Sequence, residues 1–199
     1  MVYSDFTLKR VKAELNIKLI EDEVLFPQIE EIEISPFLET TLKRNVPLAL
    51  AINTEKARSE LIIANILLEV KEQLKNEISF FSGIDLNVDK DKGLTGYCDF
   101  ILSRSKEQFY LEAPVVTIVE AKNDNMSSGL GQCIAEMYAA KLFNQKDGQE
   151  IACIYGAVTT GDEWKCLKLL GETAYIDLTK YYINEIKTIL AILVEMLKQ

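Results

Sequence analysis

Histidine is absent from this sequence of 199 residues. Imidazole is the base or the metal ligand in Ser/His/Asp triads, Cys/His proteases, HExxH zinc hydrolases and histidine-metal nucleases. The absence of histidine therefore excludes these classes together. Hydrolytic chemistry in this chain would depend on Mg²⁺ or Mn²⁺ held by carboxylates with a lysine nearby, or on paired carboxylates acting alone.

The sequence also has no CxxC pair and only four cysteines, Cys98, Cys133, Cys153 and Cys166. Each of them lies inside an apolar segment. Cysteines of this kind behave as small buried hydrophobic residues, and the lack of a pairing pattern indicates that they are reduced.

Targeting and membrane signals are missing as well. Residues 1–18 alternate charged and apolar positions instead of showing a basic region followed by an apolar block, so no signal peptide is expected. The longest apolar stretch, residues 186–196, is interrupted by polar residues and is too short to span a bilayer. We expect a soluble cytoplasmic protein with no membrane partner.

Positive charge is in short supply: 22 basic residues stand against 31 acidic ones, which gives a formal net charge of −9. Phosphate neutralisation provides most of the non-specific affinity of nucleic-acid binders. The acidic balance therefore counts against a protein that simply coats DNA or RNA.

A hydrophobic content of 48% is enough for a packed core, and no repeat or Pro/Gly/Ser linker divides the chain. The character of the sequence changes near Asn53. We expect an N-terminal helical extension over residues 1–52, packed on a core over residues 53–199 that ends in a hairpin and a helix.

Periodicity predicts helices over 4–19, from Ser35-Pro36 onward, over 54–74, 127–144 and 181–197. Strands are expected over 78–88, 96–103, 113–121 and 151–159, followed by a hairpin over 163–178. The segment 113–121 (APVVTIVEA) is almost wholly apolar, which is typical of a strand buried on both faces. This order predicts an α/β (α+β) fold in which helices flank a mixed central sheet.

Two charged residues end that buried strand. Strand geometry places Glu120 and Lys122 on one face, with Ala121 on the other. A charge pair here has to be compensated by pairing or by a ligand, because burial of an unpaired charge is costly. Taken alone, the ExK pattern is as well explained by a surface ion pair.

Further polar residues in apolar surroundings strengthen the case. Asp99 is the one charged residue of a strand-like segment that precedes Glu120, so adjacent strands would bring both carboxylates together. Helical spacing places Glu60 within an apolar stripe and Glu69 on the opposite, solvated face. Gln132, at the start of the next helix, would face the same site.

The order Glu60, Asp99, Glu120-Ala121-Lys122 and Gln132 resembles the PD-(D/E)XK, restriction-endonuclease-like nuclease superfamily over about residues 53–160. Two positions depart from the family pattern: Cys98 stands in place of the motif's proline, and Glu136 in place of a tyrosine found in RecB-like members. The resemblance implies the family's α-β-β-β-α-β core.

It also implies Mg²⁺-dependent hydrolysis of phosphodiesters. Asp99, Glu120 and Glu60 would hold Mg²⁺ or Mn²⁺, and Lys122, with Gln132 beside it, would position or activate the attacking water. DNA is the expected substrate rather than RNA, with a homodimer or a recognition subunit as partner.

Three alternatives stay open. The chain could be a catalytically inactive member of the same fold that serves as a scaffold or regulatory binding module. It could be a carboxylate-dyad hydrolase acting on sugars, although the sequence lacks an aromatic-rich cleft. It could also be a structural protein whose charged residues form incidental ion pairs and do not converge.

Overall fold

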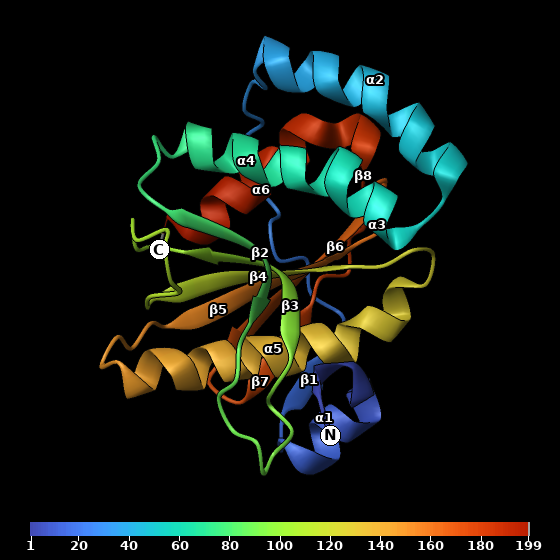
Figure 1. The fold of residues 1–199 in the computed structure, drawn as a ribbon. Coiled ribbons are helices and arrows are strands. Elements are labelled where there is room, and N and C mark those ends of the chain that lie inside the picture. Colours follow the sequence, from blue (N-terminus) through green and yellow to red (C-terminus); the bar gives the residue numbers. More distant parts are fainter. Residues whose placement is uncertain (199) are drawn as a thin grey trace.

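The computed structural model describes residues 1–198 and shows one mixed β-sheet between two layers of helices (Figure 1). The sheet has eight strands: seven follow the order β1-β7-β6-β5-β4-β3-β2, and β8 pairs with β6. Parallel pairing joins β4 to β5 and β1 to β7, while the other neighbours are antiparallel. The predicted fold class, α/β with a mixed sheet flanked by helices, is confirmed.

The strands are β1 (Lys18–Ile20), β2 (Ser79–Asp85), β3 (Tyr97–Ser103), β4 (Val115–Ala121), β5 (Cys153–Thr159), β6 (Glu163–Leu170), β7 (Thr173–Ile176) and β8 (Tyr181–Tyr182). The central strand β4 is buried at all seven positions, as its apolar sequence predicts. Parallel strands β4 and β5 are joined through helix α5.

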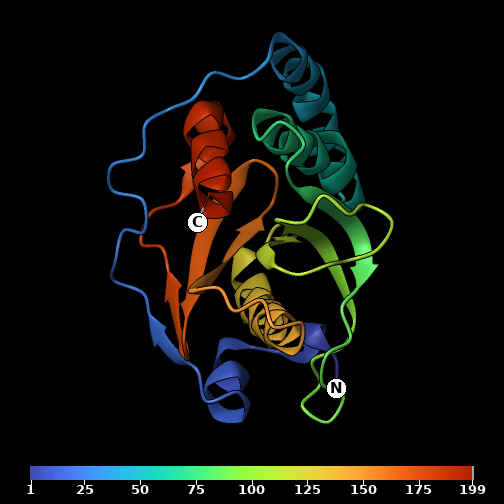
Figure 2. The same cartoon turned by 90° about the vertical axis from the view of Figure 1, so that its left-hand side faces the viewer.

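The α-helices are α1 (Leu8–Glu14), α2 (Pro36–Ile52), α3 (Glu55–Arg58), α4 (Ala64–Gln73), α5 (Met126–Lys146) and α6 (Ile186–Leu197). Short 3₁₀ turns occupy Tyr3–Asp5 and Ile183–Glu185, and a π-helical segment, Ser59–Ile63, joins α3 to α4. Helices α2, α4 and α6 cover one face of the sheet, and α5 with α1 covers the other (Figures 1 and 2). The elements α4-β2-β3-β4-α5-β5 follow the predicted α-β-β-β-α-β order.

The N-terminal region differs from its prediction. The expected helix over residues 4–19 is shorter, because α1 ends at Glu14 and the chain then forms β1. Strand β1 pairs in parallel with β7, which lies more than 150 residues further along the chain. The helix start at Ser35-Pro36 is confirmed, since the Ser35 side chain accepts a hydrogen bond from the Leu38 N–H. Residues 1–52 are thus partly helical and also extend the sheet.

Glu69 is not solvated, so that expectation is wrong. Its side chain is buried and accepts hydrogen bonds from the Ser35 N–H at 2.8 Å and the Ser35 hydroxyl at 2.6 Å. Helical periodicity within 54–74 carries no information about this partner, because Ser35 reaches it from a distant part of the chain.

All four cysteines are buried, as predicted, and no disulfide joins them within residues 1–198. None of the helices in the described part of the chain combines the length and apolar character needed to cross a bilayer.

Candidate functional site

The C-terminal end of strand β4 and the residue after it bring a carboxylate and an ammonium together. The Glu120 side chain is 1% exposed, and Lys122 Nζ donates a hydrogen bond to its Oε1. The Lys122 backbone N–H donates to the Thr159 carbonyl at 2.8 Å, which keeps the chain attached to β5 beyond the end of β4. The side chains of Glu120 and Lys122 meet as strand geometry predicts.

Asp99 reaches the same position from β3. Its Oδ2 accepts a hydrogen bond from the backbone N–H of Ala121 at 2.8 Å. This bond holds the Asp99 carboxylate at the end of β4, next to the residue that separates Glu120 from Lys122. The negative charge of this carboxylate raises the pKa of Glu120. Adjacent strands β3 and β4 thus bring these two carboxylates to the same end of the sheet.

Helix α5 supplies two further polar side chains. Gln132 Oε1 accepts a hydrogen bond from Lys122 Nζ at 3.3 Å, and Gln132 Nε2 donates to Glu136 Oε1 at 3.0 Å. Glu136 therefore fixes the amide so that its oxygen faces the lysine. Gly129 permits the close approach of helix and lysine, since a Cβ there would lie 3.1 Å from Lys122 Cε and 2.8 Å from Val158.

The electrostatics of this cluster are dominated by burial. Removal from water raises the pKa of Glu120 to about 8, repulsion from Asp99 adds to the rise, and Lys122 opposes it. Burial also raises the pKa of Glu136 well above its ordinary value, and Glu120 contributes further repulsion. Burial lowers the pKa of Lys122, but attraction to Glu120 outweighs this and the net shift is upward. Lys122 is thus the one basic side chain in a cluster with the acidic side chains of Asp99, Glu120 and Glu136.

Two carboxylate oxygens in the cluster lack a hydrogen-bond partner. Glu120 Oε2 and Glu136 Oε2 are both buried and unpaired within the described residues, as is Asn123 Oδ1 on the segment after β4. Buried polar atoms without partners are rare in native proteins, and they often mark a site that binds water, an ion or a ligand. Glu120 Oε2 is therefore an available oxygen donor beside Asp99.

Glu60 does not have the environment expected of it. Its side chain is 64% exposed and pairs with Lys56 at 3.8 Å, so its placement in the apolar stripe is wrong. The buried pairs Ala57–Arg58 and Ile62–Ile63 are five residues apart, because the π-helical segment inserts an extra residue between them. A projection at 100° per residue fails across such a segment.

Among the acidic residues of α3 and α4, Glu55 acts on the site through its charge, although the sequence pattern did not predict it as a site residue. Its charge raises the pKa of both Glu120 and Lys122. Glu55 is exposed in the first turn of α3, directly after the Thr54 cap. Proximity to that cap was the only local signal, and it does not distinguish a site residue from a favourable helix-dipole interaction.

The donor set fits a magnesium or manganese ion held by two carboxylates. Residues 1–198 contain no group of three or more His, Cys, Asp or Glu side chains arranged to hold a metal. Mg²⁺, however, usually keeps several waters and binds proteins through one or two carboxylates. Asp99 and Glu120 supply such a pair, and the unpaired Glu120 Oε2 is an oxygen of the type that this hard cation prefers.

Comparison of the chain with protein-family models and with curated proteins gives no match in either case.

Proposed function

We propose that the protein is a nuclease that hydrolyses phosphodiesters in DNA with Mg²⁺ or Mn²⁺. The observation that carries the proposal is the convergence of Asp99, Glu120 and Lys122 at neighbouring strand ends, with an unpaired carboxylate oxygen beside the lysine. The order of these residues along the chain also resembles the PD-(D/E)XK superfamily.

Each residue has a role that follows from its position. Asp99 and Glu120 would hold the metal, which when bound lowers the pKa of water and stabilises charge on the phosphate. Lys122 would donate hydrogen bonds to the attacking water or to a phosphate oxygen. Gln132 orients the Lys122 ammonium, and Glu136 orients Gln132.

We also propose a cellular location and a kind of partner for the protein. Buried cysteines that form no disulfide suit a cytoplasmic protein. The net charge of −9 suits an enzyme that relies on a homodimer partner or a recognition subunit to hold DNA.

An inactive scaffold of the same fold is the second candidate. It is favoured by the exposure of Glu60 and by the direct Lys122–Glu120 ion pair, which partly neutralises the cluster without a metal. A protein of this kind would keep the fold and bind no divalent cation.

Calorimetric titration of Mn²⁺ and Mg²⁺ tests the proposal, with nuclease assays on single- and double-stranded DNA and on RNA. We expect the wild type to bind Mn²⁺ and to cleave DNA, and EDTA to abolish cleavage. Asp99→Asn and Glu120→Gln should each weaken Mn²⁺ binding and DNA cleavage by about 100-fold or more. Even residues that only support metal ligands typically change metal affinity or activity by about 10- to 100-fold.

Glu60→Gln is the matched control, because this carboxylate is exposed and paired with Lys56. It should bind metal and cleave DNA as the wild type does. A wild type that binds neither Mn²⁺ nor Mg²⁺ would establish the inactive scaffold instead, and cleavage that survives Asp99→Asn and Glu120→Gln would contradict the assigned site.

A further inference from the structure

The segment between β1 and α2 forms a conspicuous acidic surface. This segment, called here the acidic strap (residues 21–35), contains six acidic residues and no lysine or arginine. It runs along the outside of α6, on the face of the sheet opposite α5 (Figure 2). The negative charge of the acidic strap would repel the phosphates of a nucleic acid, so this surface is unsuitable for binding DNA or RNA.

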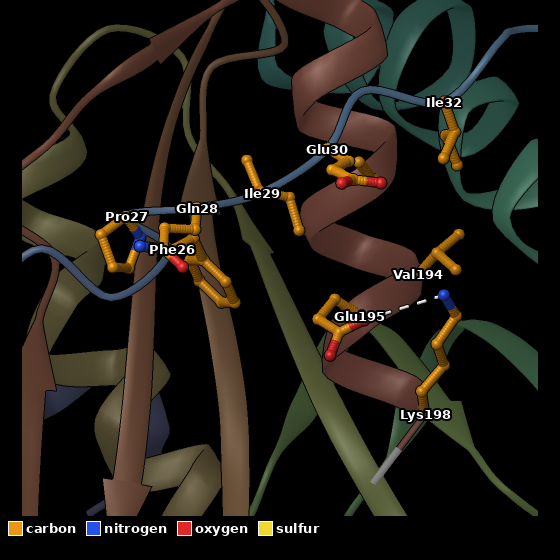
Figure 3. Close-up of a pocket in the computed structure, with 10 residues that line it drawn as sticks. Phe26, Pro27, Gln28, Ile29, Glu30, Ile32, Val194, Glu195 and Lys198 are labelled. Atoms are coloured by element: carbon orange, nitrogen blue, oxygen red, sulfur yellow. Dashed lines mark ion pairs between the residues drawn. The ribbon is translucent and has the colours of Figure 1, made fainter.

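A groove of about 470 Å³ lies between the acidic strap and the C-terminal half of α6 (Figure 3). Six of its ten lining residues are apolar, and the charged ones are Glu30 and the ion pair of Glu195 with Lys198. The residues from the strap are Phe26, Pro27, Gln28, Ile29, Glu30 and Ile32, and those from α6 and its end are Ala191, Val194, Glu195 and Lys198. A groove of this size can take a few side chains of a bound segment.

Both ends of the strap are attached to the body of the protein. At the first end, the Leu178 N–H donates to the Glu23 carbonyl at 2.8 Å and the Leu25 N–H to Asp177 Oδ1 at 3.3 Å. At the second end, Lys187 pairs with Glu33 at 2.7 Å. The wall of the groove is therefore fixed before any partner binds, which lowers the entropy lost on binding.

Between these attachments the strap has unused binding groups. Residues 29–32 are outside any helix, turn or strand, and their backbone groups make no hydrogen bond to another backbone group within residues 1–198. The Glu30 carboxylate is exposed and has no ion pair among the described residues. An extended chain laid beside residues 29–32 would find free N–H and C=O groups, apolar contacts and an unneutralised carboxylate.

We propose that this groove binds an extended segment of a partner protein in which apolar residues alternate with lysine or arginine. The apolar side chains would enter the groove against Ile29 and Val194, the backbone would pair with residues 29–32, and the basic side chains would face Glu30. The groove lies against α6, whereas Lys122, the partner of Glu120, donates to Gln132 of α5 on the other face of the sheet, so the docked segment leaves the candidate site open. The proposal does not depend on nuclease activity.

Three fluorescein-labelled decapeptides provide the test: one alternates isoleucine with lysine, one isoleucine with glutamate and one serine with lysine. Anisotropy at near-physiological salt should show micromolar binding of the Ile/Lys peptide, about tenfold tighter than either control. The Ser/Lys peptide reports non-specific attraction to an acidic protein. Amide NMR shifts should localise the Ile/Lys peptide to Ile29–Ile32 and Val194.

Two variants and one control assign the surface. Ile29→Asp and Glu30→Lys should each weaken the Ile/Lys peptide by about tenfold or more, the first by loss of apolar contact and the second by charge reversal. Asp91→Lys makes the same charge reversal on an exposed residue of the β2–β3 connection and should leave binding unchanged. Circular dichroism melts confirm that each variant is folded.

Several results would overturn the proposal. These are no binding of the Ile/Lys peptide, equal binding of the Ser/Lys or Ile/Glu peptide, shifts confined to the surface around Asp99, or a Glu30→Lys variant that binds as the wild type does. Sedimentation that reveals a dimer dissociated by Ile29→Asp would assign the groove to a second copy of this chain.

Discussion

Glu120 shows how strongly its surroundings can change the acidity of one side chain. A carboxyl with an ordinary pKa of 4.5 has a pKa of about 8 in the folded protein, mainly because of burial and then because of Asp99. The folded state therefore holds this proton more tightly than the unfolded chain does. Linkage then requires the contribution of Glu120 to stability to fall as pH rises from about 4.5 to about 8, and to level off above that.

Glu120→Gln tests this linkage, because glutamine keeps the shape and does not ionise. The variant should gain stability relative to the wild type as pH rises, with a gain on the order of 3 kcal/mol between about pH 5 and about pH 8.5. Urea unfolding at the two pH values measures the difference. A constant difference at both pH values would show that Glu120 has an ordinary pKa in the folded state.

Gln132 provides a second residue-scale prediction, which rests on the proposed nuclease activity. Gln132→Leu leaves Lys122 without its amide acceptor and Glu136 without its donor. Cleavage at saturating Mn²⁺ should fall by about 10- to 100-fold, as expected for a group that orients a site residue. Gln145→Leu, at an exposed position of the same helix, is the control and should cleave normally. Equal activity of the two variants would remove Gln132 from the site.

At the scale of elements, the helix over residues 55–73 shows the limits of periodic patterns. The π-helical segment Ser59–Ile63 turns Glu60 outward, and tertiary contact with Ser35 buries Glu69. A regular α-helix would bury Glu60 and expose Glu69, which is the opposite of what is observed. The exposure of Glu60 depends on backbone hydrogen bonding within the helix, and the burial of Glu69 on a partner that only the folded chain supplies.

The Glu69–Ser35 contact couples α4 to the first turn of α2, which gives a testable consequence. Glu69→Ala removes two hydrogen bonds from Ser35, the capping residue of α2, and should lower the free energy of unfolding by about 2 kcal/mol. Hydrogen exchange should accelerate in the first turn of α2. Glu72→Ala, on the exposed side of α4, should change neither quantity appreciably. Unaltered exchange in Glu69→Ala would mean that the Glu69–Ser35 hydrogen bonds do not stabilise the first turn of α2.

At the scale of the whole molecule, the net charge of −9 limits how the protein can bind nucleic acid. Lys122, the lysine of the candidate site, is already engaged by Glu120 and Gln132. Without a divalent ion we therefore expect weak DNA binding, with a slope of log K against log salt no steeper than about −3. Anisotropy of a labelled duplex in EDTA, and again in Mn²⁺, measures this. A slope of about −6 would indicate an extended basic track and contradict the expectation.

Strong local patterns in the sequence specify the main helices and strands. The apolar run before Glu120 requires a buried strand, Ser35-Pro36 and Thr54 provide helix caps, and the ExK ending places Glu120 and Lys122 on one face. The lack of histidine limited the chemistry to carboxylates and lysine. These conclusions depend on neighbours within a few residues, which is why they could be reached without a structure.

Tertiary structure decided what depends on distant partners. The β1–β7 pairing, the burial of Glu69 against Ser35, and the contact of Gln132 in α5 with Lys122 after β4 each join elements that local periodicity treats separately. Glu55 acts on Glu120 because Arg58 ties α3 to the Thr160 carbonyl just beyond the end of β5. Short-range propensity acts along the chain, whereas burial, charge coupling and cross-chain pairing act through space, so only the folded molecule could set them.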